Sequence, residues 1–175
     1  MKNKITFILG GIKSGKSSYA VEQAKIFSKK YKSSVTYLAT CIPEDEEMEK
    51  RVAKHKATRP KNWLTIEEPV NLIEALKKIK SEILIVDCLN IWLSNVLEKN
   101  WGENKIIAYI KKFCSELKNK KITCFVVSNE VGLSLVSPNK TGRLFQNILG
   151  KINQVVAKIS DDVYFLVAGI PLKLK

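Results

Sequence analysis

Short apolar runs alternate along this chain with longer segments in which apolar residues recur every three or four positions. The runs predict strands at Ile5–Leu9, Val35–Ala39, Leu64–Glu67, Ile83–Val86, Ile122–Val127 and Val163–Val167. The periodic segments predict helices at Ser17–Tyr31, Glu44–Thr58, Val70–Ile79, Leu89–Leu97, Ile106–Leu117 and Arg143–Ile159. Most of the strands are apolar at consecutive positions, which is typical of strands buried on both faces of a parallel sheet. The pattern predicts an α/β fold, with a mostly parallel sheet covered by helices on both faces.

The chain contains no internal repeat, low-complexity tract or clear linker. Its 175 residues fit a single domain. We therefore expect residues 1–175 to form one domain. The segment Asn129–Gly142 contains Gly, Pro, Asn and Ser, and it predicts a long functional loop within that domain.

The formal net charge of +13 suggests acidic partners, such as nucleic acid, an anionic membrane or phosphorylated ligands. Only three of the 30 basic residues are arginines, namely Arg51, Arg59 and Arg143. Nucleic-acid readout favours the planar guanidinium, whereas scattered lysines are typical of a solvated helix surface. We therefore expect no specific nucleic-acid partner.

The four cysteines form no C-x-x-C pair, and three of them fall in apolar runs. They are expected to be reduced and mostly buried, not to form disulfides or a zinc site. No stretch approaches the length of a membrane span, and the short apolar start leads into glycines instead of a cleavage site. These features predict a cytoplasmic protein.

The segment after the first predicted strand has the pattern G-x-x-x-x-G-K-[ST], which binds nucleotide phosphates. It comprises Gly10, Gly11, Ile12, Lys13, Ser14, Gly15, Lys16 and Ser17. Backbone N–H groups of such a loop bind phosphate oxygens, the lysine neutralises the β and γ phosphates, and the hydroxyl binds Mg²⁺. A chance Lys-Ser after a glycine turn is the alternative, but the strand before and the helix after favour the phosphate loop. The fold expected is therefore the P-loop NTPase type (RecA-like).

Such a site also needs an acid for the metal at the end of a neighbouring strand. Asp87 directly follows the apolar run Ile83–Val86 and is the candidate. The alternative is that Asp87 caps the following helix, and one carboxylate could do both.

His55 is the only histidine, and it lies between two lysines with Arg51 one turn earlier. Positive neighbours disfavour the imidazolium and keep the ring neutral and nucleophilic, and the same charges attract phosphate. The alternative is a surface histidine on a solvated basic helix.

Taken in order, these motifs resemble one family along nearly the whole chain. They are GGIKSGKS, TYLATCIPEDEEMEKRVAKHKATRP, WLTIEEP, IVDCLNIWLSNVL, SNEVGLSLVSP, GKINQVVA and AGIPLKLK. The chain resembles the bifunctional adenosylcobinamide kinase / adenosylcobinamide-phosphate guanylyltransferase family of cobalamin biosynthesis.

The resemblance implies two reactions at one site. Adenosylcobinamide is phosphorylated with ATP or GTP as the donor, and GMP is then transferred from GTP through a guanylyl-histidine. The histidine falls on His55, with Lys16 as the second catalytic residue and Mg²⁺ as the cofactor. The resemblance also implies a homo-oligomer, specifically a trimer.

The resemblance further implies a set of nucleotide-contacting residues beyond the phosphate loop. They are Thr40, Cys41, Ile42, Lys56, Ala57, Thr58, Arg59, Glu67 and Asp87. Ser17 and Asp87 are the implied metal ligands. A carboxylate that accepts from guanine N1–H and its amino group would explain a preference for GTP.

The chain departs from the family pattern at three places. Some relatives have Glu at position 87, many have a second histidine where Lys54 stands, and many have Arg-Asp in place of Gln146 and Asn147. An ion pair at the last place is expected to have become an amide contact. Two other functions remain open: a kinase for another small alcohol, without a nucleophilic His55, and a basic nucleotide-switch or nucleic-acid-binding module.

Overall fold

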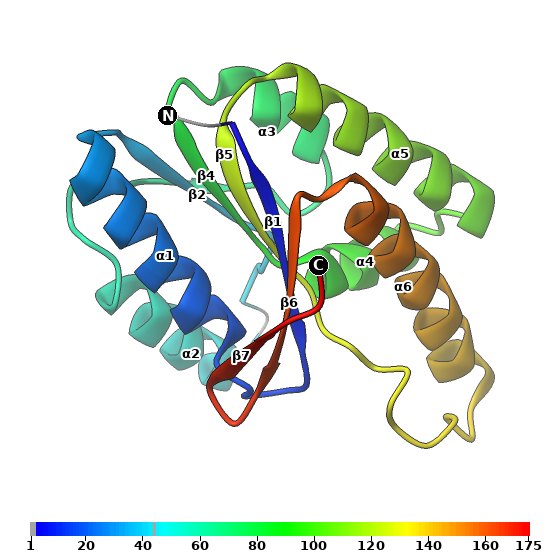
Figure 1. The fold of residues 1–175 in the computed structure, drawn as a ribbon. Coiled ribbons are helices and arrows are strands. Elements are labelled where there is room, and N and C mark those ends of the chain that lie inside the picture. The colour runs from blue at the N-terminus through cyan, green and yellow to red at the C-terminus, as the bar shows by residue number, and fades with distance from the viewer. Residues whose placement is uncertain (1–2, 44) are drawn as a thin grey trace.

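A computed structural model describes residues 3–43 and 45–175, apart from the side chains of Arg51 and His55 (Figure 1). The strands are β1 (Ile5–Gly10), β2 (Val35–Ala39), β3 (Leu64–Glu67), β4 (Ile83–Asp87), β5 (Thr123–Val127), β6 (Asp162–Val167) and β7 (Ile170–Lys173). The helices are α1 (Lys16–Tyr31), α2 (Glu46–Ala57), α3 (Leu72–Lys78), α4 (Leu89–Glu98), α5 (Glu103–Asn119) and α6 (Lys140–Ile159).

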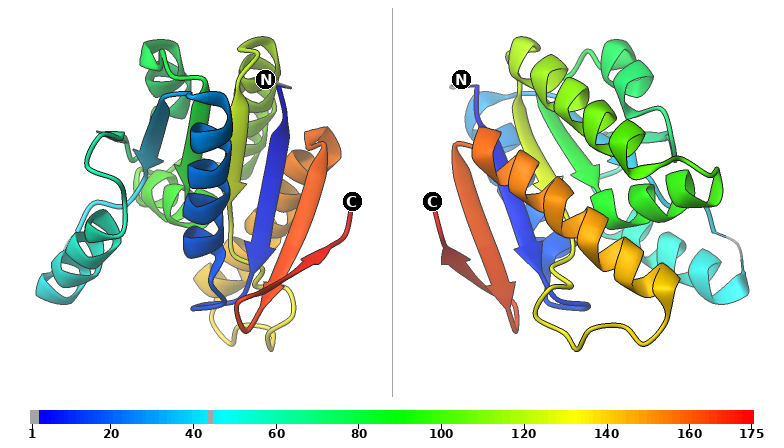
Figure 2. Two further views of the ribbon diagram at one scale, coloured as in Figure 1. Left: turned by 60° about the vertical axis from the view of Figure 1, so that its left-hand side comes forward. Right: turned by 90° about the vertical axis from the view of Figure 1, so that its right-hand side faces the viewer.

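The strands form one seven-stranded sheet in the order β3-β2-β4-β5-β1-β6-β7. All neighbouring pairs are parallel except β6 and β7, which form an antiparallel hairpin at one edge (Figure 2). The predicted mostly parallel sheet is confirmed. Parallel pairing places the carboxyl ends of β1, β2, β4 and β5 at the same edge, where ligands bind in open α/β sheets.

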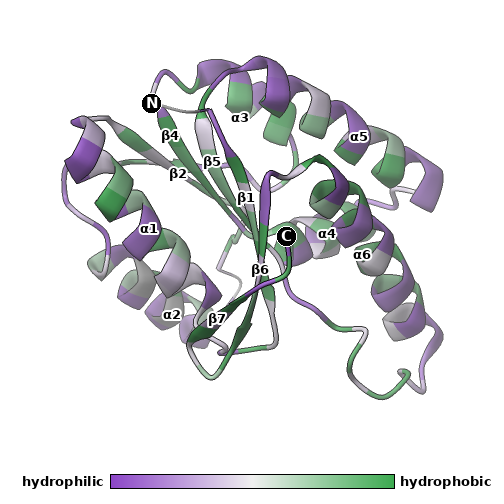
Figure 3. Ribbon diagram, viewed as in Figure 1, coloured by the Kyte–Doolittle hydropathy of each residue, from purple (hydrophilic) through white to green (hydrophobic). Residues whose placement is uncertain are grey.

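Helices cover both faces of the sheet, as predicted, but unequally. On one face α1 packs Ala20, Val21 and Ala24 against the sheet. On the other face α3, α4, α5 and α6 build the larger core around the fully buried Trp92. Figure 3 shows the central strands mostly green and the helices purple along their outer sides, as expected for a sheet buried between two layers.

Six of the seven strands were predicted to within two residues of their ends. The exception, β7, was missed because its four residues are all exposed and include Pro171. Proline has no N–H to donate, so strands contain it mainly at a sheet edge, which is where β7 lies. The start predicted for the second helix, Glu44, lies outside the described residues, and α2 begins at Glu46.

Within the described ranges, no helix is both long enough and apolar enough to cross a membrane. The four cysteines are free, as expected, although only Cys114 and Cys124 are fully buried. Cys41 and Cys88 are half-buried and follow the ends of β2 and β4. Two of the four thiols therefore lie at the edge of the sheet that carries the phosphate loop.

Candidate active site at the carboxyl edge of the sheet

The phosphate loop connects the end of β1 to the start of α1, and two of its glycines are required by close packing. A side chain at Gly10 would place its Cβ 2.5 Å from the carbonyl oxygen of Leu166 on β6. Gly15 has φ +94°, and a Cβ there would lie 3.2 Å from Cα of Gly169 in the β6–β7 turn. The Gly169 N–H also donates to the Ser14 carbonyl at 3.0 Å. The β6–β7 hairpin, whose second strand the sequence did not predict, therefore packs against the phosphate loop.

The start of α1 is arranged for an anion. No acidic residue lies in its first turn, and Gly15 at the N-cap provides no side-chain cap. The first N–H groups of a helix have no intrahelical partner, so they remain for phosphate oxygens. Lys16 is buried, and its ammonium donates to the Gly11 carbonyl at 2.6 Å, which holds the charge inside the loop. Ser17 lies one residue further on, on the first turn of α1.

Asp87 is the last residue of β4, but β4 is not the neighbour of β1. The strand β5 lies between them, so the expectation of a neighbouring strand was wrong. Parallel pairing nevertheless places both strand ends at the same edge of the sheet, and the positive charge of Lys16 acts to lower the pKa of Cys88, the residue after Asp87. Burial raises the pKa of the Cys88 thiol far above its usual range, and the negative charge of Asp87 adds to this. Cys88 therefore remains a neutral thiol beside the site.

Asp87 does not cap the following helix. Cys88 holds the N-cap position of α4, and no side-chain hydrogen bond caps that helix. The Asp87 carboxylate instead accepts a hydrogen bond from the hydroxyl of Tyr37 on β2. This excludes the helix-capping alternative and leaves the carboxylate at the strand edge for a metal ion or nucleotide.

Tyr37 is a residue that the sequence reasoning missed. Its ring is buried on the α1 face of the sheet, and the Arg59 guanidinium carbon lies 3.4 Å from the ring centroid. Burial is the main cause that raises the pKa of its hydroxyl far above the usual value, with the Asp87 charge second. The consecutive apolar positions of β2 predicted a buried side chain here, but gave no signal of its two polar partners.

The end of α2 lies opposite the start of α1. A small cavity of about 130 Å³ separates them, lined by Ser17, Ser18, Val21, Tyr37, Lys54 and Thr58. The Lys25 ammonium of α1 also donates to the Thr58 carbonyl at 3.1 Å. The structure therefore brings the predicted Ser17 and Thr58 together across one cavity.

Two further predicted site residues form an ion pair. The Lys56 ammonium lies 2.6 Å from the Glu67 carboxylate, and both side chains are about half exposed. Such pairs contribute little to folding stability because solvent screens them. Arg59, Lys56 and Glu67 thus lie on one segment that runs from α2 into β3, with Ala57 exposed beside them.

The predicted stretch Thr40 to Ile42 follows β2, and its three residues differ in exposure. Thr40 has an exposed fraction of 0%. Its hydroxyl donates to the Cys88 carbonyl and accepts from the Cys88 N–H, and Asn95 donates to its carbonyl. In this conformation Thr40 offers no exposed atom to a ligand, so the geometry assigns it to holding β2 and β4 together instead of contacting nucleotide. Cys41 is half-buried, and Ile42 is exposed.

The predicted loop Asn129–Gly142 is real, although its last residues already belong to α6. It begins next to the phosphate loop, because the Glu130 N–H donates to the Gly10 carbonyl at 3.0 Å. The Gln146 amide bridges the loop: it accepts from the Ser137 N–H and donates to the Leu135 carbonyl. The amide contact expected for Gln146 is therefore made with the loop backbone.

His55 lies by its backbone in α2, between Lys54 and Lys56. Its side chain, like that of Arg51, lies outside the described part of the structure. The role of His55 therefore stays a prediction, which rests on its place in α2 opposite the phosphate loop.

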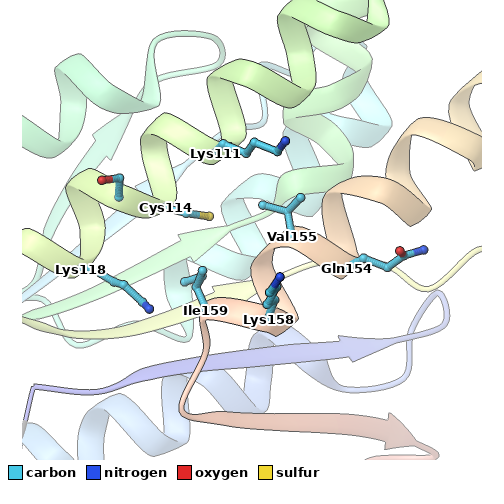
Figure 4. Close-up of a pocket in the computed structure, with 8 residues that line it drawn as sticks. Lys111, Cys114, Lys118, Gln154, Val155, Lys158 and Ile159 are labelled. Carbon is cyan, nitrogen blue, oxygen red and sulfur yellow. The ribbon is translucent and has the colours of Figure 1, made fainter.

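A second and larger hollow lies far from these residues, between α5 and α6 (Figure 4). It measures about 510 Å³, and Lys111, Lys118 and Lys158 surround an apolar floor of Cys114, Val155 and Ile159. None of its lining residues belongs to the phosphate loop or to the ends of β2 and β4. The predicted site residues Ser17 and Thr58 line the smaller cavity instead.

The phosphate loop follows the first strand of a mostly parallel sheet, and Asp87 lies at the end of a strand two places away. These features place the chain in the class of P-loop NTPases. Two solved structures share the fold. The KaiC-like protein PH0186 from Pyrococcus horikoshii OT3 has a TM-score of 0.57 at 13% identity, covering 94% of this chain and 71% of that one. The flagellar accessory protein FlaH from Methanocaldococcus jannaschii has a TM-score of 0.60 at 13% identity, covering 99% and 79%. This likeness shows the fold alone.

Sequence comparison narrows the class to a family. Residues 6–174 match the family model "Cobinamide kinase / cobinamide phosphate guanyltransferase". The bifunctional adenosylcobalamin biosynthesis protein CobP of Pseudomonas aeruginosa is 36% identical, over 96% of this chain and 95% of the relative. The CobU protein of Escherichia coli K12, with the same description, is 30% identical over 96% and 98%. The chain belongs to this family, and it is an enzyme of cobalamin biosynthesis in the kinase and guanylyltransferase class.

Proposed function

We propose that one site, formed by the phosphate loop and α2, catalyses both reactions of the family. In the first, the aminopropanol hydroxyl of adenosylcobinamide attacks the γ-phosphorus of ATP or GTP and loses its proton. The bond from the γ-phosphorus to the bridging oxygen breaks, so the nucleoside diphosphate leaves. In the second, GMP from GTP is joined to the new phosphate, giving adenosyl-GDP-cobinamide and pyrophosphate. The observation that supports a shared site is the cavity between Ser17 of the phosphate loop and Thr58 at the end of α2.

The second reaction proceeds in two displacements, with His55 as the nucleophile. A ring nitrogen of His55 attacks the α-phosphorus of GTP, and the bond to the bridging oxygen breaks, so pyrophosphate leaves. An oxygen of the cobinamide phosphate then attacks the same phosphorus, and the phosphorus–nitrogen bond breaks, which restores the histidine. A positioned nucleophile divides one difficult transfer into two easier steps. Lys54 and Lys56, exposed on either side of His55 in the chain, supply positive charge that attracts the phosphates.

The residues present fit a magnesium ion that is held mainly by the nucleotide. Mg²⁺ prefers oxygen ligands and usually keeps only one or two from the protein, with phosphates and waters supplying the rest. The Ser17 hydroxyl and the Asp87 carboxylate are oxygen ligands of this kind, and the described residues contain no group of three or more His, Cys, Asp or Glu that could hold a metal alone. When bound, the ion would neutralise charge on the phosphates. Lys16 supplies the same electrostatic support from the protein.

Glu67 is the candidate for guanine recognition. Its carboxylate lies at the end of β3 and is half exposed, so it can accept from guanine N1–H and the amino group. Its present partner, the Lys56 ammonium, is also half exposed. An exchange of this partner for the base costs little, because an exposed ion pair is weak.

The test is covalent labelling. The protein is mixed with α-labelled GTP and Mg²⁺, and label on the protein that is acid-labile and base-stable indicates a phosphoramidate. A kinase for another small alcohol would transfer phosphate but would acquire no label from the α position. Absence of label from an otherwise active, folded preparation would sink the guanylyl-histidine.

A basic nucleic-acid-binding module is the second alternative, and its test is salt dependence. The excess of lysines supports only weak, sequence-independent binding that weakens steeply as salt rises. A tight complex with DNA or RNA that persists at physiological salt would contradict this expectation.

We further propose that the chain forms a homo-oligomer, with a trimer expected from the family, and works in the cytoplasm. Three large apolar side chains, Leu133, Leu135 and Val136, are exposed on the loop beside the phosphate loop, and Leu135 has an exposed fraction of 94%. Clustered exposed apolar residues commonly mark protein contacts. Light scattering of the purified protein tests the oligomeric state, and a monomer at micromolar concentration would contradict it.

A further inference from the structure

Tyr37 connects two parts of the site that come from different segments of the chain. It lies in the middle of β2 and pairs with Ile85 on β4, so Tyr37 and Asp87 project from the same face of the sheet. The ring is packed among residues of α1, β4 and β5, and its exposed fraction is only 2%. Phenylalanine would serve that packing equally well, so the hydroxyl needs a separate explanation.

The hydroxyl orients the Asp87 carboxylate. It donates to Oδ2 of Asp87. This hydrogen bond occupies one carboxylate oxygen and limits rotation of the carboxylate group. The other oxygen remains for a ligand at the end of β4, where the phosphates and their metal ion are proposed to bind.

The ring holds the Arg59 guanidinium. Arg59 follows the end of α2, and its guanidinium carbon is 3.4 Å from the ring centroid. Among the described residues, one Nη donates to the Thr65 hydroxyl at 3.4 Å, and the buried Nε has no hydrogen-bond partner. Stacking on Tyr37 therefore contacts Arg59 on a planar face that hydrogen bonds do not use, and the same ring lines the cavity facing Ser17.

We propose that Tyr37 is a positioning residue with two separable roles: its hydroxyl orients Asp87 toward the metal-bound phosphates, and its ring holds Arg59 against the phosphates. This inference rests on the proposed function. It goes beyond it by coupling the metal side of the site on β4 to the phosphate side on the segment after α2, through one side chain.

Two variants separate the roles. Tyr37→Phe keeps the ring and removes the hydroxyl, and Tyr37→Leu removes both. The readouts are Mn²⁺ binding to the protein–GTP complex, followed by electron paramagnetic resonance, and binding of a fluorescent GTP analogue in EDTA. Tyr37→Phe is expected to weaken Mn²⁺ binding about 5–10-fold, because the hydroxyl acts on the metal only through the orientation of Asp87, with metal-free nucleotide affinity within about twofold. Tyr37→Leu is expected also to weaken metal-free nucleotide binding about 5–10-fold.

A double variant tests whether the hydroxyl acts through Asp87. In an Asp87→Asn background, Tyr37→Phe should produce no further loss of Mn²⁺ binding, since residues that act through one contact are not additive. The matched control is Tyr109→Phe on α5, whose hydroxyl accepts from the Ile73 N–H on the opposite face of the sheet. This control should lower the melting temperature and leave Mn²⁺ binding unchanged.

Unchanged Mn²⁺ binding in Tyr37→Phe would overturn the hydroxyl's role. Unchanged metal-free nucleotide binding in folded Tyr37→Leu would overturn the ring's role. If Tyr37→Leu fails to fold, Arg59→Met is measured in its place and should show the same loss of metal-free binding, and unchanged binding would count against the ring's role. None of these measurements needs cobinamide, so failure of the proposed reactions would appear separately, as a wild-type protein that binds Mn²⁺ and GTP but forms no cobinamide product.

Discussion

At the residue scale, Lys16 contributes a positive charge inside a loop that otherwise offers backbone N–H groups. Lys16→Ala should weaken both reactions, because one loop is proposed to hold the phosphates in each. Loss of a charge-assisted contact in a desolvated site costs about 1.5–3 kcal/mol, or roughly 10- to 150-fold in kcat/KM. Kinase and guanylyl transfer are assayed on one preparation, with Lys29→Ala, exposed in the last turn of the same helix, as the control. Normal kinetics in either assay would show that the loop is not shared.

His55→Ala should have unequal consequences for the two reactions. Labelling by α-labelled GTP should disappear and guanylyl transfer should fall by orders of magnitude, because the covalent step is lost. Some kinase activity should survive, since the substrate hydroxyl attacks the γ-phosphate directly. The melting temperature should change little, and Lys50→Ala, exposed on the same helix, is the control. Loss of both activities together with early melting would mean that His55 is structural.

Residue identity predicted the phosphate loop better than it predicted the partners of that loop. Phosphate binding requires the spacing found from Gly10 to Ser17, so the motif can be recognised from the sequence alone. Tyr37 and Thr40 carry no such signal, because their roles depend on which strand lies beside β2. That strand is β4, more than 40 positions further along the chain.

At the scale of elements, the side chain of Gln146 bridges three residues of the loop before α6. Gln146→Ala removes hydrogen bonds to the Ser137 N–H, the Ser134 hydroxyl and the Leu135 carbonyl. The loss should be about 1 kcal/mol locally, and the Ser137 amide should exchange roughly five times faster. Hydrogen exchange measures this, with the exposed neighbour Asn147→Ala as the control. Equal protection in both variants would mean that the loop is ordered by other contacts.

The hairpin at the sheet edge depends on Asp162. Burial acts to raise the pKa of this carboxyl, but hydrogen bonds and charges from Lys4 and Lys173 outweigh it and hold the pKa below its usual value. A carboxyl with a depressed folded-state pKa stabilises the fold above its unfolded pKa of about 3.9, and the stability is lost as pH falls through the folded value.

Asp162→Asn should therefore lower the free energy of unfolding by about 1–2 kcal/mol at pH 7, and the difference from the wild type should shrink as pH falls through the depressed folded-state pKa of Asp162. Urea unfolding at several pH values measures this dependence. Glu98→Gln, an exposed carboxyl on α4, should leave the curve unchanged at every pH. If the free energy of unfolding of Asp162→Asn stayed below that of the wild type by the same amount down to low pH, the loss would come from packing and not from charge.

Local sequence patterns predicted which helices and strands exist, but they did not predict where some of them begin or end, and they missed the last strand. The helix α6 was predicted from its apolar repeat, yet it begins three residues earlier, at Lys140, because the Asn139 side chain accepts from the Gly142 N–H as an N-cap. The strand β7 has no buried face, so no apolar pattern could predict it. It exists because β6 offers an unpaired edge.

At the scale of the whole molecule, we propose that residues 1–175 form one cooperative domain. Adjacent residues of β1 belong to different cores: Phe7 faces α3–α6, and Ile8 faces α1. Because both helix layers pack on the same strands, unfolding of one layer should disrupt the other. Calorimetry should therefore show a single transition with equal calorimetric and van't Hoff enthalpies. Fluorescence of Trp92 and Trp63, which lie on opposite faces, should report the same midpoint. Two transitions would contradict a single domain.

The α/β class, the phosphate loop and the family could be predicted from the chain alone, because each depends on residues close together or on their order along the chain. The strand order could not be predicted, since pairing of parallel strands depends on crossovers and on two packed layers instead of local pattern. That order placed β5 between the phosphate loop and Asp87, and set Tyr37 beside Asp87 and under Arg59. The sequence contains the chemical groups of the site, and the packing of the strands and helices makes the contacts that orient those groups.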